Sequence, residues 1–130
     1  MRDLAKHACT LADIVGLDMY YKVFVTRQFS KSFYMGPRDS SEEIRKHLSQ
    51  HKKPLWITEL QAEPWEHNHK AYLSENPGSI NPERLQKNVA EVTIMQPEAI
   101  FLWGSEYWLW KKNQGDDNMW RTVTNIIQPL

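Results

Sequence analysis

Three short apolar runs along the chain predict the strands of a sheet. They cover residues 12–20, 55–58 and 99–104, and their lengths and residue types are typical of β-strands. The second run is apolar on both faces, which is typical of a strand in a parallel sheet covered on both sides. Glu59 follows this run directly, at the carboxyl end of the strand, where α/β folds place ligand chemistry. The pattern therefore predicts an α/β fold with Glu59 as a candidate nucleophile or base.

Helices are predicted between and after these strands. Ser40 and Glu43 have the spacing of a capping box, which predicts a helix leading back to the second strand. Asn81 and Pro82 predict a second helix start, with an N-cap and a proline in the first turn. The apolar residues of this second helix recur at helical spacing and form a core-facing stripe: Leu85, Val89, Val92 and Met95. Residues 119–127 are predicted to form a short closing helix.

Two long segments are predicted as loops. Residues 22–36 are rich in aromatic side chains, which either line a binding cleft or pack the loop onto the rest of the fold. Residues 60–80 form the longer connection and carry most of the polar side chains that follow Glu59. At the amino terminus, residues 2–10 are predicted to be the end of a helix.

The composition excludes several classes of function. The 130 residues have an ordinary globular composition, and sixteen basic residues balance sixteen acidic ones, so no net charge attracts nucleic acid. Cys9 is the single cysteine, which excludes an internal disulfide and a cysteine-rich metal site. His67 and His69 lack a clear third ligand, so we expect no metal and no other cofactor. The sequence leaves the localisation open.

Three motifs resemble the last strands of the (β/α)8-barrel retaining glycoside hydrolases, in the cellulase-like families related to family 5. They are ADIVGLDMY at residues 12–20, WITELQAEPW at residues 56–65 and IFLWGSEYW at residues 100–108. The motifs follow one another in the order that those barrels use for strands six, seven and eight. The resemblance covers nearly the whole chain but only the last third of such a barrel.

This resemblance implies a fold and a domain organisation. The expected fold is α/β, a partial TIM (β/α)8 barrel of three parallel strands with covering helices. A complete barrel needs about 250 residues, so residues 1–130 are expected to be the incomplete C-terminal portion of such a domain. The acid/base glutamate, which the family carries in an Asn-Glu pair on strand four, is expected to lie outside this chain. The open strand edges are expected to pair with the missing part of the barrel or with another copy of the chain.

The resemblance also implies roles for individual residues. Glu59 matches the catalytic nucleophile at the end of strand seven. Tyr20 matches a tyrosine that hydrogen-bonds this nucleophile and orients it. Trp103 matches the tryptophan of strand eight that forms a platform beneath the sugar. The expected partner is therefore a carbohydrate substrate.

The loop that follows Glu59 contributes further candidates for substrate binding. The amide of Gln61 suits sugar hydroxyls, and the indole of Trp65 suits the apolar face of a pyranose ring. Glu63 is expected either to bind a hydroxyl or to hold the loop.

Functions from different classes fit these residues. The first is a fragment of a retaining β-glycoside hydrolase acting on a polysaccharide or oligosaccharide, which lacks its acid and is expected not to hydrolyse ordinary glycosides alone. The second is a non-catalytic carbohydrate-binding remnant, whose aromatic side chains hold sugar. A third is an unrelated small α/β domain with a structural glutamate, and the occurrence of three motifs in barrel order weighs against it.

Overall fold

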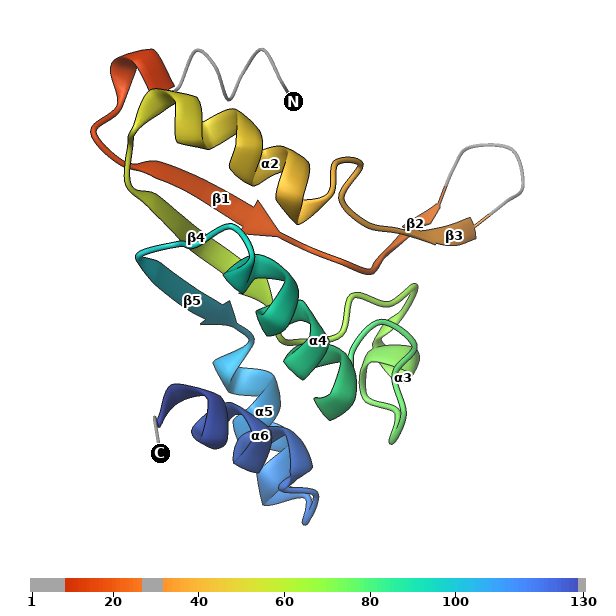
Figure 1. The fold of residues 1–130 in the computed structure, drawn as a ribbon. Helices are drawn as coiled ribbons and strands as arrows, with labels where there is room; N and C mark the ends of the chain where they lie inside the picture. Colours follow the sequence, from red (N-terminus) through yellow and green to blue (C-terminus); the bar gives the residue numbers. More distant parts are fainter. Residues whose placement is uncertain (1–8, 27–31, 129–130) are drawn as a thin grey trace.

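The computed structural model describes residues 9–26 and 32–128 and has a mixed α/β architecture (Figure 1). Three parallel strands form the central sheet in the order β1 (Val15–Met19), β4 (Leu55–Gln61) and β5 (Ala99–Trp103). The three predicted strands and their parallel arrangement are therefore confirmed. The order of these three strands in the sheet is also their order along the chain. Each parallel pair, β1 with β4 and β4 with β5, is joined by a crossover that contains a helix.

Two helices cover one face of this sheet. The helix α2 (Ser41–Leu48) continues into the short 3-10 helix η1 (Ser49–His51), and α4 (Pro82–Thr93) packs against β4 (Figure 1). Buried apolar residues join both helices to the strands in one core cluster: Cys9, Val15, Met19, Leu48, Leu55, Ile57, Leu60, Val92 and Met95. This cluster fixes the positions of the strands whose ends carry the candidate site.

Both predicted helix starts are confirmed by their caps. The Ser40 hydroxyl accepts a hydrogen bond from the Glu43 backbone N–H at 3.3 Å, and the Glu43 carboxylate accepts one from the Ser40 N–H at 2.9 Å. The side chain of Asn81 accepts a 2.8 Å bond from the backbone N–H of Arg84. These contacts satisfy N–H groups that a helix leaves free in its first turn. The helix predicted over residues 2–10 lies outside the described residues, except for its last two positions, which are helical.

None of the described elements covers the other face of the sheet. Phe101 and Trp103 are about half exposed there, at 51% and 48%, and Thr58 of β4 is exposed. The expectation that β4 is covered on both sides is therefore wrong for the described residues. The physical reason is that α2 and α4 both lie on the side of Leu55 and Ile57, which are buried.

The segment predicted as an aromatic loop is a β-hairpin. The strands β2 (Val23–Thr26) and β3 (Ser32–Met35) pair in antiparallel register, with Phe24 opposite Tyr34. The rings of this pair meet edge to face, with centroids 5.6 Å apart, and cross-strand aromatic pairs of this kind stabilise hairpins. The hairpin lies beyond the carboxyl end of β1 (Figure 1).

The C-terminal part of the chain forms a second core. The helix α6 (Asn118–Ile127) agrees with the predicted closing helix, whereas α5 (Ser105–Asn113) was not expected. The short helix α3 (His69–Tyr72) interrupts the segment predicted as one long loop. Buried residues of α4, α5 and α6, of the segment before α4 and of the position directly after β4 form this cluster: Ala62, Ile80, Leu85, Tyr107, Trp108, Met119 and Val123.

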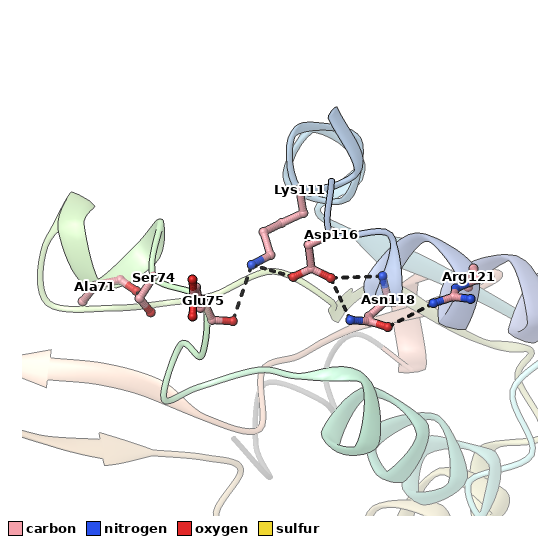
Figure 2. A network of polar contacts seen from close by, with 7 residues as sticks. All are labelled: Ala71, Ser74, Glu75, Lys111, Asp116, Asn118 and Arg121. Atoms are coloured by element: carbon pink, nitrogen blue, oxygen red, sulfur yellow. Dashed lines mark hydrogen bonds and ion pairs between the residues drawn. The ribbon is translucent and has the colours of Figure 1, made fainter. Parts of the chain in front are cut away.

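A polar network ties the turn between α5 and α6 to the segment after α3 (Figure 2). The buried ammonium of Lys111 lies 2.8 Å from Asp116 Oδ2 and donates a 3.4 Å bond to the backbone carbonyl of Glu75. Asp116 also accepts a 2.8 Å bond from the Asn118 side chain, and Asn118 accepts one from Arg121. The network has a structural role, because it holds α5 to these two segments and supplies the partners that a buried ammonium needs.

Within residues 9–26 and 32–128, no helix is both long enough and apolar enough to cross a membrane.

Substitution of Leu85, which is fully buried in α4, tests the importance of the second core. We expect Leu85→Ala to lower the free energy of unfolding by about 2–5 kcal/mol, because it leaves a cavity between helices and sheet. The matched control is Leu109→Ala in α5, where the side chain is 49% exposed and a loss below about 1 kcal/mol is expected. Urea unfolding of both variants measures the difference, and equal losses would contradict the described core.

Candidate functional site

A β-bulge in β4 sets the direction of the Glu59 side chain. Ile57 pairs with β1 in regular register, but the next residue of β1, Asp18, pairs with Glu59, so Thr58 is an extra residue in β4. The pairing of β4 with β5 shifts at the same place. Without the extra residue, strand alternation would turn Glu59 to the face of Ile57, beneath the helices. The bulge instead places Thr58 and Glu59 on the open face and returns Leu60 to the core.

Glu59 is hydrogen-bonded to Tyr20 at the carboxyl edge of the sheet. The Tyr20 hydroxyl donates a 2.6 Å bond to Glu59 Oε2, and both side chains are partly buried. Desolvation, together with this bond and the nearby negative charge, raises the pKa of Tyr20 well above its ordinary value of 10.0. Tyr20 therefore remains the donor of the pair at neutral pH. The contact that the resemblance implies is present, and the catalytic role of Glu59 stays a prediction.

The neighbouring side chains on the open face accommodate the bulge. Thr58 Oγ1 donates a 2.7 Å hydrogen bond to Asp18 Oδ1. Gly16 leaves space for Thr58, because a Cβ at position 16 would lie only 2.8 Å from Thr58 Cγ2. Asp18 therefore stands beside Glu59 in the sheet but directs its carboxylate to a different partner.

Gln61 has a structural contact in place of the sugar contact predicted for it. Its side chain is fully buried. The amide nitrogen donates a 2.9 Å bond to the carbonyl of Lys22, and the amide oxygen accepts a 2.9 Å bond from the N–H of Lys22. Both polar atoms of the amide are therefore used in anchoring the base of the hairpin to the end of β4.

Trp65 lies beside Tyr20 with its ring accessible. The two rings meet edge to face, with centroids 5.1 Å apart, and Trp65 is 44% exposed. Its backbone is held on both sides: the carbonyl accepts a 3.1 Å bond from the N–H of Phe24, and the N–H donates a 2.8 Å bond to Ser79 Oγ. A fixed backbone with an exposed indole is suited to stacking against an apolar ligand face.

The carboxylate of Glu66 joins the hairpin to the loop before α4. Tyr34 donates a 2.6 Å bond to Glu66 Oε2, and the N–H and hydroxyl of Ser79 both donate 2.7 Å bonds to Oε1. Partial burial alone would raise the pKa of Glu66, but the hydrogen bonds from Tyr34 and Ser79 outweigh it and lower the pKa. The hydrogen bond between Tyr34 and Glu66 is also the largest cause that raises the pKa of Tyr34 to about 12.

Trp103 and Glu63 form the second part of the candidate site. The Trp103 Nε1–H donates a 3.1 Å bond to Glu63 Oε1, and the Tyr72 hydroxyl donates a 3.2 Å bond to Glu63 Oε2. Gly104 follows with a φ of +126°, and a Cβ there would lie 2.5 Å from the Glu63 Cβ. A glycine is needed at this position both for its backbone conformation and for the close approach of Glu63.

The described residues do not contain a cluster of three or more His, Cys, Asp or Glu side chains placed to hold a metal. The two histidines considered in the sequence pack on aromatic rings. His67 lies 5.1 Å from the ring of Phe24, and His69 stacks on Tyr72 at 6.3 Å between centroids.

The structure brings five of the six predicted site residues, all except Gln61, into two adjoining groups at the carboxyl ends of the strands. The first contains Glu59, Tyr20 and Trp65, and the second contains Trp103 and Glu63. Sequence reasoning missed Tyr34 and Glu66, because they are 32 residues apart and no spacing relates them. It also missed Tyr72.

Comparison of the chain with protein-family models, with curated proteins and with solved structures found no match in any of the three.

The hydrogen bonds to Glu66 predict a pH dependence of the hairpin attachment. Because the pKa of Glu66 is lowered from 4.5 in the folded chain, its bonds stabilise the fold fully above about pH 4.5, and this contribution is lost as the pH falls through the lowered pKa. Tyr34→Phe removes one of the bonds and should raise the pKa of Glu66, measured by carboxyl-carbon NMR titration. Tyr72→Phe, whose hydroxyl bonds a different glutamate, is the matched control. An unchanged pKa of Glu66 in Tyr34→Phe would contradict this account.

Proposed function

We propose that this chain carries the nucleophile-bearing part of a retaining β-glycoside hydrolase site, acting on a polysaccharide or oligosaccharide. The observation that carries the proposal is the 2.6 Å hydrogen bond from Tyr20 to Glu59 at the carboxyl end of a parallel strand. A nucleophilic carboxylate must be oriented toward the anomeric carbon, and a neighbouring donor that keeps its own proton provides this orientation. Glu59 is the nucleophile of the proposed reaction, and Tyr20 is its positioning residue.

The general acid of the proposed reaction comes from outside this chain. Retaining hydrolases place their two carboxyl groups about 5–5.5 Å apart on opposite sides of the scissile bond. The nearby carboxylates are directed elsewhere: Asp18 accepts from Thr58, and Glu63 accepts from Trp103 and Tyr72. Ordinary glycosides need protonation of the leaving oxygen, which contributes about a hundred- to ten-thousandfold in rate.

Aromatic side chains on both sides of Glu59 supply the sugar-binding surface of the proposal. Trp65 lies on the side of Tyr20, and Trp103 lies at the end of β5, and both rings are nearly half exposed. Indole faces stack on the apolar faces of pyranose rings. Gln61 is not part of this surface, because its amide is buried.

The proposal includes a larger barrel, of which this chain forms strands six to eight. Three features support it: the strands are parallel and neighbour one another in chain order, α2 and α4 cover one face of the sheet, and the aromatic face is open. Along β1, a groove of about 600 Å³ has the apolar residues Leu17, Met19 and Ile44 in its lining, together with charged residues such as Glu43 and Lys46. Further β/α units are the proposed partner at this edge.

A non-catalytic carbohydrate-binding function is the second candidate. The exposed rings of Trp65 and Trp103 favour it, because they need no acid in order to hold sugar. It differs from the first candidate in one respect: it assigns no covalent chemistry to Glu59.

Trapping of the covalent intermediate tests the first candidate. We expect an activated dinitrophenyl 2-deoxy-2-fluoro glycoside, offered as the cellobioside and the mannobioside, to leave an adduct on Glu59, because its leaving group departs without an acid. Intact mass and peptide mapping detect the adduct. Glu59→Gln should abolish it, and the corresponding methyl glycoside should form none. A folded sample that binds cellohexaose but forms no adduct would favour the carbohydrate-binding function.

The proposed role of Tyr20 predicts a separate effect on the same reaction. Tyr20→Phe keeps the ring against Trp65 but removes the bond to Glu59. We expect the rate of adduct formation to fall about 100-fold, because the nucleophile loses its orientation. Tyr107→Phe, in a buried position of α5, is the control and should leave this rate unchanged. Equal rates in Tyr20→Phe and the unsubstituted chain would contradict the role.

A further inference from the structure

The carboxylate of Glu63 has both oxygens engaged by side chains of the protein. Oε1 accepts from the indole N–H of Trp103 at 3.1 Å, and Oε2 accepts from the hydroxyl of Tyr72 at 3.2 Å. Its side chain is partly buried, between the end of β5 and the helix α3. A carboxylate with two such donors is directed toward the protein and away from a ligand.

We propose that Glu63 is a positioning residue that fixes the plane of the Trp103 indole, an inference that concerns the sugar platform and so rests on the proposed function. Without a partner, a half-exposed tryptophan is free to rotate about its side-chain bonds. A charge-assisted bond to the indole N–H removes this freedom at the edge of the ring and leaves the ring face accessible. Because the N–H is already used, Trp103 meets a ligand through its ring face.

The backbone around this pair is held independently of the side-chain contact. The N–H of Ala62 donates a 3.0 Å bond to the carbonyl of Trp103, and the carbonyl of Ala62 accepts a 2.6 Å bond from the indole of Trp108. The strand ends therefore keep the Cα atoms of Glu63 and Trp103 in place. Loss of the Glu63 carboxylate should release the Trp103 ring without unfolding its surroundings.

Tyr72 extends the contact to α3. Its hydroxyl donates to Glu63, and its ring stacks on His69 and meets Tyr107 edge to face at 5.3 Å. Desolvation and the charge of Glu63 raise the pKa of Tyr72 to about 12, so its hydroxyl remains a donor at neutral pH. Tyr72 thereby holds the second oxygen of Glu63 and sets the direction in which the first oxygen faces Trp103.

The direct test follows the indole N–H of Trp103 by two-dimensional NMR of chain labelled with ¹⁵N in its six tryptophans. Trp103→Phe identifies the Trp103 resonance by its disappearance. We expect Glu63→Ala to move this resonance upfield and to speed its exchange with solvent. Glu63→Gln should restore the slow exchange with a smaller shift, because an amide oxygen accepts a weaker bond than a carboxylate. Glu98→Ala, which removes an exposed carboxylate before β5, is the matched control.

Binding of cellohexaose and mannohexaose, measured by calorimetry, gives the functional consequence. We expect Glu63→Ala to weaken binding of the preferred hexaose about tenfold and Glu63→Gln less than about twofold, where a tenfold change corresponds to about 1.4 kcal/mol. A Trp103 resonance that is unchanged in Glu63→Ala would overturn the inference, even in a chain that binds sugar. A resonance that moves as expected in a chain that binds neither hexaose would support the positioning by Glu63 and overturn the proposed sugar function.

Discussion

The extra residue in β4 is the constraint on which the rest of the candidate site depends. A regular strand would direct Glu59 into the apolar layer beneath α2 and α4, where an ionised carboxylate is strongly disfavoured. The bulge keeps Ile57 and Leu60 in the core and turns Glu59 to Tyr20. Core packing and site geometry are thus satisfied by one strand, because the bulge separates the two requirements along its length.

Two carboxylates organise the loops around this strand. Glu66 holds the hairpin to the segment before α4, and Glu63 holds Trp103 to α3. Each accepts hydrogen bonds from a tyrosine that remains protonated at neutral pH, because the pKa values of Tyr34 and Tyr72 are both about 12. Polar contacts therefore hold the loops around the candidate site, whereas apolar packing holds the strands that carry it.

Much of the fold is predictable from local sequence signals, because those signals act over a few residues. The caps at Ser40 and Asn81 and the apolar stripe of α4 are examples. The helix α5 was not predicted because its apolar residues stand consecutively at positions 107–110, so they give no helical stripe. The hairpin was not predicted because its strands have four residues each and are tied by contacts with distant segments.

The site was predictable only in part, for a related reason. Motif resemblance indicated the pair of Tyr20 and Glu59, but the extra residue at Thr58 leaves no mark in an apolar run. Gln61 illustrates the limit: an amide beside a candidate nucleophile suits a ligand by its chemistry, and only the tertiary structure assigns it to the backbone of Lys22. The contacts at Glu59, Thr58, Gln61 and Trp103 all join residues 39 or 40 apart. Such long-range contacts form after the chain has closed large loops, so during synthesis the carboxylate of Glu59 would gain its orientation only once the strands on either side of it have docked.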